Sequence, residues 1–225
     1  MTDCYQPAER HFRVTRSCLE VCLEARQPIS IITKNALVTR DLDLLKEMAH
    51  WNLINVAVSI TTLDKKLASF MEPRTSIPEA RLRALRELGE VGIPTHVMAA
   101  PVIPGLNDSE IPSILREASG AGASTASYIL LRLPLNVRPV FQEWLERTQP
   151  DARSRVESRI RSTRDGELSD SQFGTRMRGE GEIAKQIENT FRVFAQKYGL
   201  DGQPPTLDSS SFRRPTSSTG QRYLF

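Results

Sequence analysis

A lysine stands directly after the first short apolar run of the chain. The run covers residues 29–33, and Lys34 is followed by Asn35, so a cation lies among hydroxyl and amide groups. Such a lysine can bind a carboxylate or a phosphate, because its ammonium group is a compact charge with three donors. A lysine at this place is also commonly a solvated loop residue. The residues alone leave both interpretations open.

Hydroxyl groups and a rigid loop follow the next two apolar runs. Ser59, Thr61 and Thr62 end the second run. Their hydroxyls suit a ribose or a carboxylate, but Thr61 or Thr62 as the N-cap of the next helix is the favoured interpretation. The third run continues into a proline-rich loop from Pro101 to Asn107, which leads to a helix start where backbone can approach an anion.

The apolar runs have the pattern of strands that are covered on both faces. Each is apolar at nearly every position, without polar alternation. The runs lie at residues 29–33, 55–60, 95–102 and 127–133, and helical patterns lie between them at 40–51, 77–92 and 107–122. This alternation predicts an α/β protein with a parallel sheet, whose functional loops gather at the carboxyl ends of the strands.

Changes of pattern along the chain predict three regions. Residues 1–135 hold the strands and the helices between them, and residues 136–200 contain only helical patterns. Residues 201–225 are rich in Pro, Ser and Thr and are predicted to be a disordered tail. Within the helical region, the motif FGTRMRGEGE at 173–182 either clamps an anionic substrate or forms a surface loop.

Length and composition narrow the class of protein. The 225 residues carry a formal net charge of +3, with basic and acidic residues interspersed, so no strong nucleic-acid signature is present. No run is long and apolar enough for a membrane helix, and a cytoplasmic location is expected. The cysteines at positions 4, 18 and 22 predict neither a disulfide framework nor a metal site, and Cys18 and Cys22 are expected to be small buried hydrophobic side chains.

Six segments, in order, resemble the radical S-adenosylmethionine (SAM) proteins related to spore photoproduct lyase. They are TDCYQPAE, ISIITKN, VSITTLDKKLASFMEPRTS, GIPTHVMAAPVIPGLND, LLRLPLNVRPVFQEWL and FGTRMRGEG. The resemblance extends from about Thr2 to Leu200. It implies the carboxyl-terminal part, strands three to six, of a partial (β/α)6 barrel, followed by helices.

The same resemblance implies two cofactors and a set of residues near them. A [4Fe-4S] cluster is held by three cysteines spaced CxxxCxxC, and SAM, bound to the cluster, is cleaved to a 5′-deoxyadenosyl radical that abstracts hydrogen from the substrate. A reductant such as flavodoxin or ferredoxin and a damaged-DNA substrate are the implied partners, and no membrane is. Motif by motif, the cofactor-binding positions are Thr2 and Asp3 (SAM amino group), Lys34 (carboxylate), Ser59 (ribose or carboxylate), Pro101 to Asn107 (adenine side) and Arg132 (end of the sixth strand). No catalytic residue is assigned.

Against the family pattern, the sequence starts at the end of the second strand. The cluster cysteines are therefore expected upstream of Met1, and we expect an exposed edge on the first strand present. Three explanations account for the late start: a misassigned start of the gene, a separate cluster-bearing chain, or a decayed gene. The first hypothesis is the SAM- and substrate-binding part of a lyase-like enzyme. The alternative is a non-catalytic βα domain that binds a nucleotide or a protein.

Overall fold

A computed structural model describes residues 3–170 and 172–215 of the chain, and its centre is one parallel sheet. The strands β1 (Ile29–Thr33), β2 (Ile54–Ser59), β3 (Thr95–Val102) and β4 (Thr125–Leu130) pair in the order β1-β2-β3-β4. Thr33 lies opposite Val58, and Ser59 lies opposite Met98. The carboxyl ends of the strands therefore meet at one edge, and the predicted α/β class with a partial parallel barrel is confirmed.

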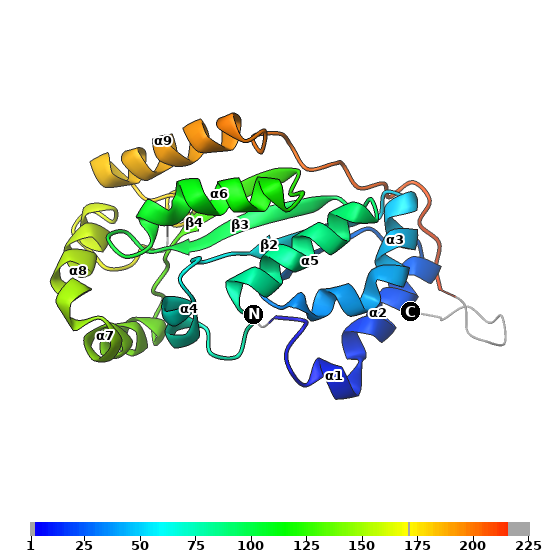
Figure 1. The fold of residues 1–225 in the computed structure, drawn as a ribbon, viewed down its shortest axis with the longest axis horizontal. Helices are drawn as coiled ribbons and strands as arrows, with labels where there is room; N and C mark the ends of the chain where they lie inside the picture. Colours follow the sequence, from blue (N-terminus) through cyan, green and yellow to red (C-terminus); the bar gives the residue numbers. More distant parts are fainter. Residues whose placement is uncertain (1–2, 171, 216–225) are drawn as a thin grey trace.

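Helices alternate with the strands and continue after them (Figure 1). They are α1 (Glu9–Phe12), α2 (Val14–Glu24), α3 (Leu42–His50), α4 (Lys65–Met71), α5 (Pro78–Glu90), α6 (Ile111–Gly120), α7 (Val137–Thr148), α8 (Arg153–Ser162) and α9 (Gly181–Lys197), with the 3-10 turns η1 (Ala36–Asp41), η2 (Asp108–Glu110) and η3 (Pro150–Ala152). In Figure 1, α5 and α6 lie along one face of the sheet and α9 lies beyond α6. In the described parts of the chain, every helix is too short or too polar to cross a membrane.

The main core lies between the sheet and these helices. Val56, Val58 and Val97 are fully buried there, as expected for strand residues that face a covering layer of helices. The other face of β1 is open, because Ile32 remains 53% exposed while its neighbour Ile31 is buried. Within the described ranges, β1 has one strand partner and stands at the edge of the sheet.

The helices after residue 135 do not share one core. Apolar side chains of α7 and α8 form a second cluster with Ile103 and Leu133, beside the carboxyl ends of the strands. In contrast, α9 contributes Ile187 and Ala195 to the main core, and the Ser119 hydroxyl donates to the backbone carbonyl of Tyr198. The predicted helical extension therefore packs on the sheet in part and forms a cluster of its own in part.

The region predicted to be a disordered tail is described as far as residue 215, and it has no helix or strand. Residues 201–215 are nevertheless attached to the sheet. The amide of Asp208 donates to the carbonyl of Asn52 at 2.9 Å, and the amide of Arg213 donates to the carbonyl of Ala25 at 2.9 Å. The polar composition of residues 201–215 is thus compatible with a segment that has no helix or strand and is still hydrogen-bonded to the rest of the fold. Residues 216–225 of the predicted tail lie outside the described residues.

One predicted helix cap is wrong. The side chain of Asp64 caps α4 by accepting from the amides of Lys66 and Leu67. The Thr62 hydroxyl instead donates to Glu110 at 2.6 Å, which links the loop after β2 to η2. An aspartate was available two residues later and is an equally good N-cap, which the sequence interpretation overlooked.

Candidate functional site

A cavity lies at the carboxyl ends of the strands and brings together four of the residues predicted to bind the cofactor. Its volume is about 290 Å³, and it is lined by Lys34, Ser59, Met98, Ala100, Pro101, Ile129, Leu130, Leu131 and Arg132. The parallel register explains the grouping, because it aligns the ends of neighbouring strands at the same height. Lys34, Ser59, Pro101 and Arg132 are the predicted residues among these.

Asp3 fixes the strand end that carries Lys34. One carboxylate oxygen of Asp3 accepts from the Thr33 hydroxyl at 2.8 Å, and the other accepts from the Lys34 amide at 2.7 Å. The amide of Tyr5 also donates to Asp3. Both oxygens of Asp3 are therefore used inside the protein, and the turn Asp3 to Tyr5 holds the end of β1. Thr2, predicted beside Asp3, lies outside the described residues.

The ammonium group of Lys34 is paired with Glu72, a residue to which the sequence analysis assigned no role. Glu72 follows α4, and its side chain is only 8% exposed. One oxygen of Glu72 accepts from the Lys34 ammonium group and from Thr61 Oγ1, and the other accepts from Arg81 Nη2 at 2.6 Å. Burial alone would raise the pKa of Glu72, but Lys34 and Arg81 together hold that pKa below its usual value.

Arg81 is the second residue of this cluster that sequence reasoning missed. It is 2% exposed and donates to the backbone carbonyls of Ser59 and Ser76. The signal was present in the sequence, because Arg81 falls on the apolar stripe of α5 with Ala84, Leu85 and Leu88. A charged residue on a buried stripe must be paired. Lys34 and Arg81 therefore share the carboxylate of Glu72, while the carboxylate of Asp3 binds the backbone of the same strand end.

Ser59 and Asn107 differ in what their side chains do. Ser59 is buried at the cavity wall, and among the described residues its hydroxyl has no hydrogen-bond partner. Asn107 is also buried, but its amide group donates to the carbonyls of Thr61 and Pro101 and its oxygen accepts from the amide of Ile103. Asn107 therefore shapes the loop that carries Pro101, and the cavity is lined by that loop rather than by the Asn107 side chain.

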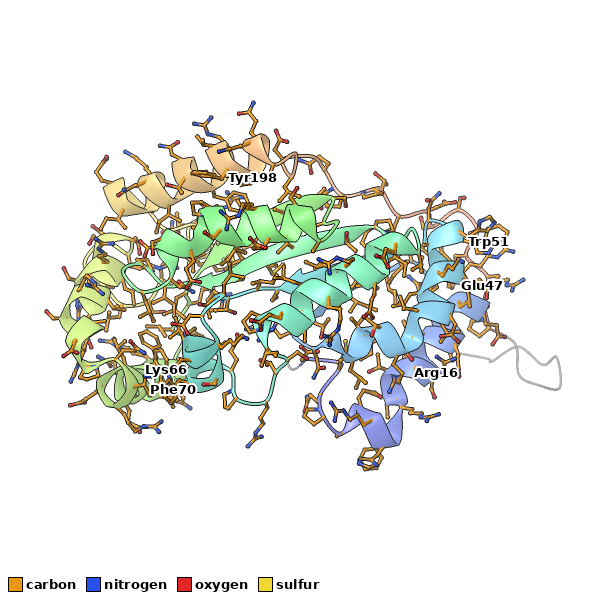
Figure 2. All side chains as sticks on the ribbon, in the orientation of Figure 1. Arg16, Glu47, Trp51, Lys66, Phe70 and Tyr198 are labelled. Atoms are coloured by element: carbon orange, nitrogen blue, oxygen red, sulfur yellow. The ribbon has the colours of Figure 1, made fainter. Side chains whose placement is uncertain are left out.

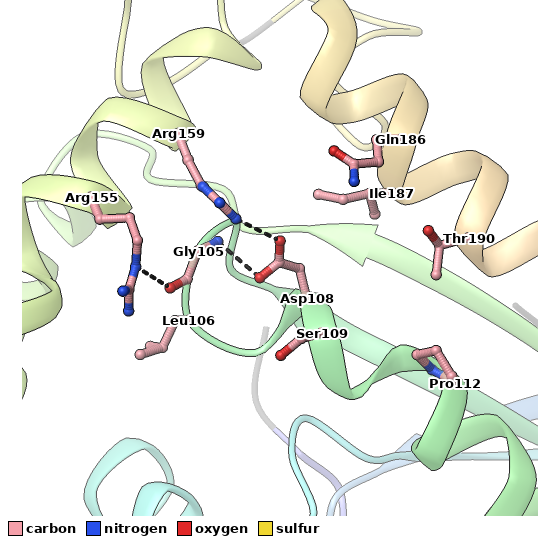
Figure 3. A pocket seen from close by; sticks show the side chains of 10 residues that line it. All are labelled: Gly105, Leu106, Asp108, Ser109, Pro112, Arg155, Arg159, Gln186, Ile187 and Thr190. Carbon is pink, nitrogen blue, oxygen red and sulfur yellow. Dashed lines mark hydrogen bonds and ion pairs between the residues drawn. The ribbon is translucent and has the colours of Figure 1, made fainter.

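A larger cavity lies between the loop after β3 and helices α8 and α9 (Figure 3). Its volume is about 420 Å³, and two arginines reach into it. Arg155 donates to the carbonyl of Gly105 at 3.2 Å, and Arg159 pairs with Asp108 at 3.4 Å. Both guanidinium groups are thus used to hold the loop, and of the predicted positions only Gly105 and Leu106, in the loop from Pro101 to Asn107, line this cavity. We place the functional site at the strand ends.

The cysteines are placed differently from the expectation. Cys18 is exposed on α2 and Cys22 is half-buried, so the prediction of two buried hydrophobic side chains is wrong for Cys18. Desolvation, and then the charge of Asp3, raise the pKa of Cys4 to about 11, so this group is a thiol at neutral pH. Within residues 3–170 and 172–215, no three His, Cys, Asp or Glu side chains are grouped as a metal site.

The motif at 173–182 lies along the free edge of β4. The carbonyl of Met177 accepts from the amide of Leu130, and the amide of Glu180 donates to the carbonyl of Thr163. Arg176 stacks over Phe173, and Arg178 lies over the ring of Tyr128 and near Glu188. The motif therefore contacts the edge of β4 next to the cavity through one backbone hydrogen bond, and its arginines are partly engaged by aromatic rings.

Comparisons with known proteins agree on the class of protein. The model of the Radical SAM superfamily matches residues 8–118. An uncharacterised protein of Mycobacterium tuberculosis, Rv2578c, is 35% identical over 156 residues, which are 68% of this chain and 46% of that protein. A protein of Methanocaldococcus jannaschii, MJ0683, is 33% identical over 152 residues, which are 68% of this chain and 55% of that protein.

Solved structures show the same fold. A mutant of spore photoproduct lyase superposes on this chain with a TM-score of 0.60 at 17% identity. The superposition covers 84% of this chain and 54% of the lyase chain. A second mutant, solved with dinucleoside spore photoproduct, superposes with a TM-score of 0.54. The chain thus spans about half the length of the curated relatives and solved structures that it matches.

The fold and the cavity define the class first: the chain is part of a parallel βα barrel with a cavity at the carboxyl ends of its strands, and Lys34, Ser59 and Arg132 are the polar residues that line it. The comparisons then point to a family: residues 8–118 match the Radical SAM superfamily, and the chain shares its fold with structures of spore photoproduct lyase. The family as a whole implies SAM and a [4Fe-4S] cluster.

Proposed function

We propose that this chain forms the SAM-binding part of a radical SAM enzyme, and that SAM occupies the cavity at the strand ends. The supporting observation is the shared ion pair beside this cavity. Lys34 lines it and shares the carboxylate of Glu72 with Arg81. An ammonium group that shares its counter-ion can also bind the carboxylate of an amino acid.

The other lining residues fit the remaining parts of SAM. The Ser59 hydroxyl has no partner among the described residues and suits a ribose hydroxyl or a carboxylate oxygen. Met98, Ala100 and Ile129 supply apolar surface of the kind that binds an adenine ring. When bound, SAM would supply the chemistry of hydrogen abstraction. The protein binds and orients it: Asp3 holds the strand end, and Glu72 holds Lys34.

The described residues do not fit the cluster itself, because they contain no grouped metal ligands. We therefore derive no step through it. For the substrate we propose damaged DNA, supported by the fold shared with spore photoproduct lyase, one structure of which contains a dinucleoside photoproduct. The reductant, flavodoxin or ferredoxin in the expectation above, remains part of the proposal.

Binding of S-adenosylhomocysteine tests the proposal without a cluster, because this analogue keeps the adenosyl group and the carboxylate. We expect the wild-type chain to bind it and Lys34→Gln to weaken binding by about tenfold, the equivalent of one charge-assisted contact. Calorimetry or ligand-detected NMR measures the affinity.

The matched control is Lys66→Gln on α4, where Lys66 is an exposed lysine (Figure 2). This variant should bind like the wild type. Equal binding by both variants would place the adenosyl ligand elsewhere. Failure of the wild-type chain to bind the analogue would leave the non-catalytic domain as the better interpretation.

A further inference from the structure

Arg132 is half-buried and carries one buried donor, its Nε atom. It follows β4 by two residues and lines the same cavity as Lys34 and Ser59. Among the described residues, the Nε atom has no hydrogen-bond partner. Leaving a buried guanidinium N–H unpaired is costly, so such groups in folded proteins generally have an acceptor. A ligand in the cavity can supply that acceptor.

A second guanidinium group lies behind Arg132. Arg164 is 2% exposed at its side chain and donates to the carbonyls of Leu131 at 3.0 Å and Thr175 at 3.2 Å. The nearest carboxylate oxygen, on Asp170, is 3.9 Å away. Burial lowers the pKa of Arg164, Asp170 opposes this effect, and the like charge of Arg132 adds to it. Two cations therefore share one distant carboxylate at the end of β4.

We propose that Arg132 binds a phosphate group of the substrate, beside the position that SAM occupies in the proposed function. This inference rests on that function and assigns Arg132 to the substrate instead of the cofactor. The guanidinium fork matches two oxygens of a phosphate, whereas Lys34 offers a point charge for the SAM carboxylate. Arg164 is held by backbone carbonyls and keeps the local potential positive. The substrate class is then a phosphate ester such as a nucleotide strand.

Two probes that differ only in their internucleoside bridge test this directly on the full chain. They are the dinucleotide thymidylyl-(3′→5′)-thymidine, whose bridge is a phosphate diester, and formacetal-linked dithymidine, whose O–CH2–O bridge is neutral. We expect the wild type to bind the dinucleotide about tenfold more tightly than the formacetal-linked dithymidine, the equivalent of one charge-assisted contact. Arg132→Gln should abolish this difference and leave the affinity for S-adenosylhomocysteine within about twofold.

The control is Arg147→Gln on α7, whose side chain is 68% exposed and which should behave as the wild type. Arg132→Gln should not lower the melting temperature, because it removes an unpaired buried donor and a repulsion with Arg164. Arg132→Lys keeps the charge but loses the fork, and it should retain only part of the preference for the dinucleotide.

Three results would overturn the proposal: an unchanged dinucleotide preference in Arg132→Gln, an equal loss of S-adenosylhomocysteine binding, or binding of the analogue but not of the dinucleotide by the wild type. These results are separate from a failure of the proposed function, in which S-adenosylhomocysteine does not bind at all.

Discussion

At the scale of single residues, the site depends on a few buried charges that hold one another in place. Lys34 could be singled out from the sequence because it follows a buried strand directly. Its partner Glu72 lies 38 positions further along the chain, and Arg81 lies in the next helix. Nothing local in the sequence pairs residues so far apart. The pairing arises because β1 and β2 are parallel neighbours, and Glu72 and Arg81 lie in the connection from β2 to β3.

Glu72→Gln tests this cluster. At pH 7 the free energy of unfolding of the variant should be about 2 kcal/mol lower than that of the wild type, because Lys34 and Arg81 lose their counter-charge. The loss is limited because Lys34 is partly solvated. The pKa of Glu72 is lowered in the folded state, so its contribution is present above the unfolded value of about 4.3 and is lost as the pH falls through the folded value. Urea unfolding between pH 3 and pH 7 measures both effects.

The exposed Glu79, which pairs with Lys65, provides the matched control. Glu79→Gln should change the unfolding free energy little, as expected for a surface pair. A Glu72→Gln variant as stable as the wild type at pH 7 would show that the cluster does not stabilise the fold.

His96 is a second buried titratable group, on β3. Its two ring nitrogens lie 2.8 Å from the Thr125 hydroxyl and 2.6 Å from the Ser127 hydroxyl, and burial lowers its pKa. The unfolded chain therefore takes up a proton near pH 6.5 before the folded chain does, and stability should fall as the pH drops below 6.5, by at most about 1.4 kcal/mol per pH unit.

Melting temperatures between pH 5 and pH 8 measure this dependence. Compared with the wild type, His96→Gln should lose less stability on acidification, whereas the control His50→Gln, at an exposed position, should follow the wild type. Parallel curves for the wild type and His96→Gln would contradict the proposed burial effect.

At the scale of elements, the strands and central helices were predictable because their sequence signals are local. The runs at 29–33 and 95–102 coincide with β1 and β3, and proline marks the start of α5. The cap of α4 and the course of the segment 201–215 were not predictable. The cap offered three candidates within four residues, Thr61, Thr62 and Asp64. The segment is attached to backbone groups of distant residues, which leave no trace in its own composition.

The loop motif at 173–182 provides a prediction at this scale. Gly179 has a φ of 72°, and a β-carbon there would lie 2.9 Å from the carbonyl oxygen of Thr163 and 2.8 Å from Leu130. Gly179→Ala should therefore lower the free energy of unfolding by about 2 kcal/mol, through the left-handed backbone and the close approach. Denaturant unfolding measures it.

The matched control is Gly120→Ala in the last turn of α6, where an added β-carbon meets no atom within 4 Å. There the exchange should be neutral or stabilise by about 0.5 kcal/mol, because alanine favours the helix. If both variants had equal stability, the loop could not be as tightly packed against β4 and α8 as described.

At the scale of the whole molecule, the predicted open edge of the sheet is present within the described ranges. β1 is the edge strand, and the large apolar side chains Phe12, Val14 and Ile32 near it are more than half exposed. Such an edge can accept a further strand. The other edge of the sheet, β4, is contacted by the motif at 173–182. The segment 201–215 then crosses to the amino-terminal ends of β1 and β2.

That crossing segment yields the last prediction. A chain ending at Leu200 loses the bonds from Asp208 to Asn52 and from Arg213 to Ala25, and the bond from the Asn55 side chain to the Pro205 carbonyl. After the entropy cost of ordering the segment is subtracted, these hydrogen bonds contribute about 2 kcal/mol to the free energy of unfolding. Relative to a chain ending at Pro215, the melting temperature should therefore fall by about 6 °C.

Hydrogen exchange provides the independent readout, because the amides of Asp208 and Arg213 should be protected in the chain that ends at Pro215. Arg213→Gln is the milder variant, since it removes the side-chain bond to the Glu24 carbonyl and keeps the backbone bond. It should lower the melting temperature by only about 2 °C. Equal melting temperatures of the chains ending at Leu200 and Pro215, with fast exchange at both amides, would show that residues 201–215 do not stabilise the fold. The packing of α9 on the main core would then be the last stabilising contact of the chain.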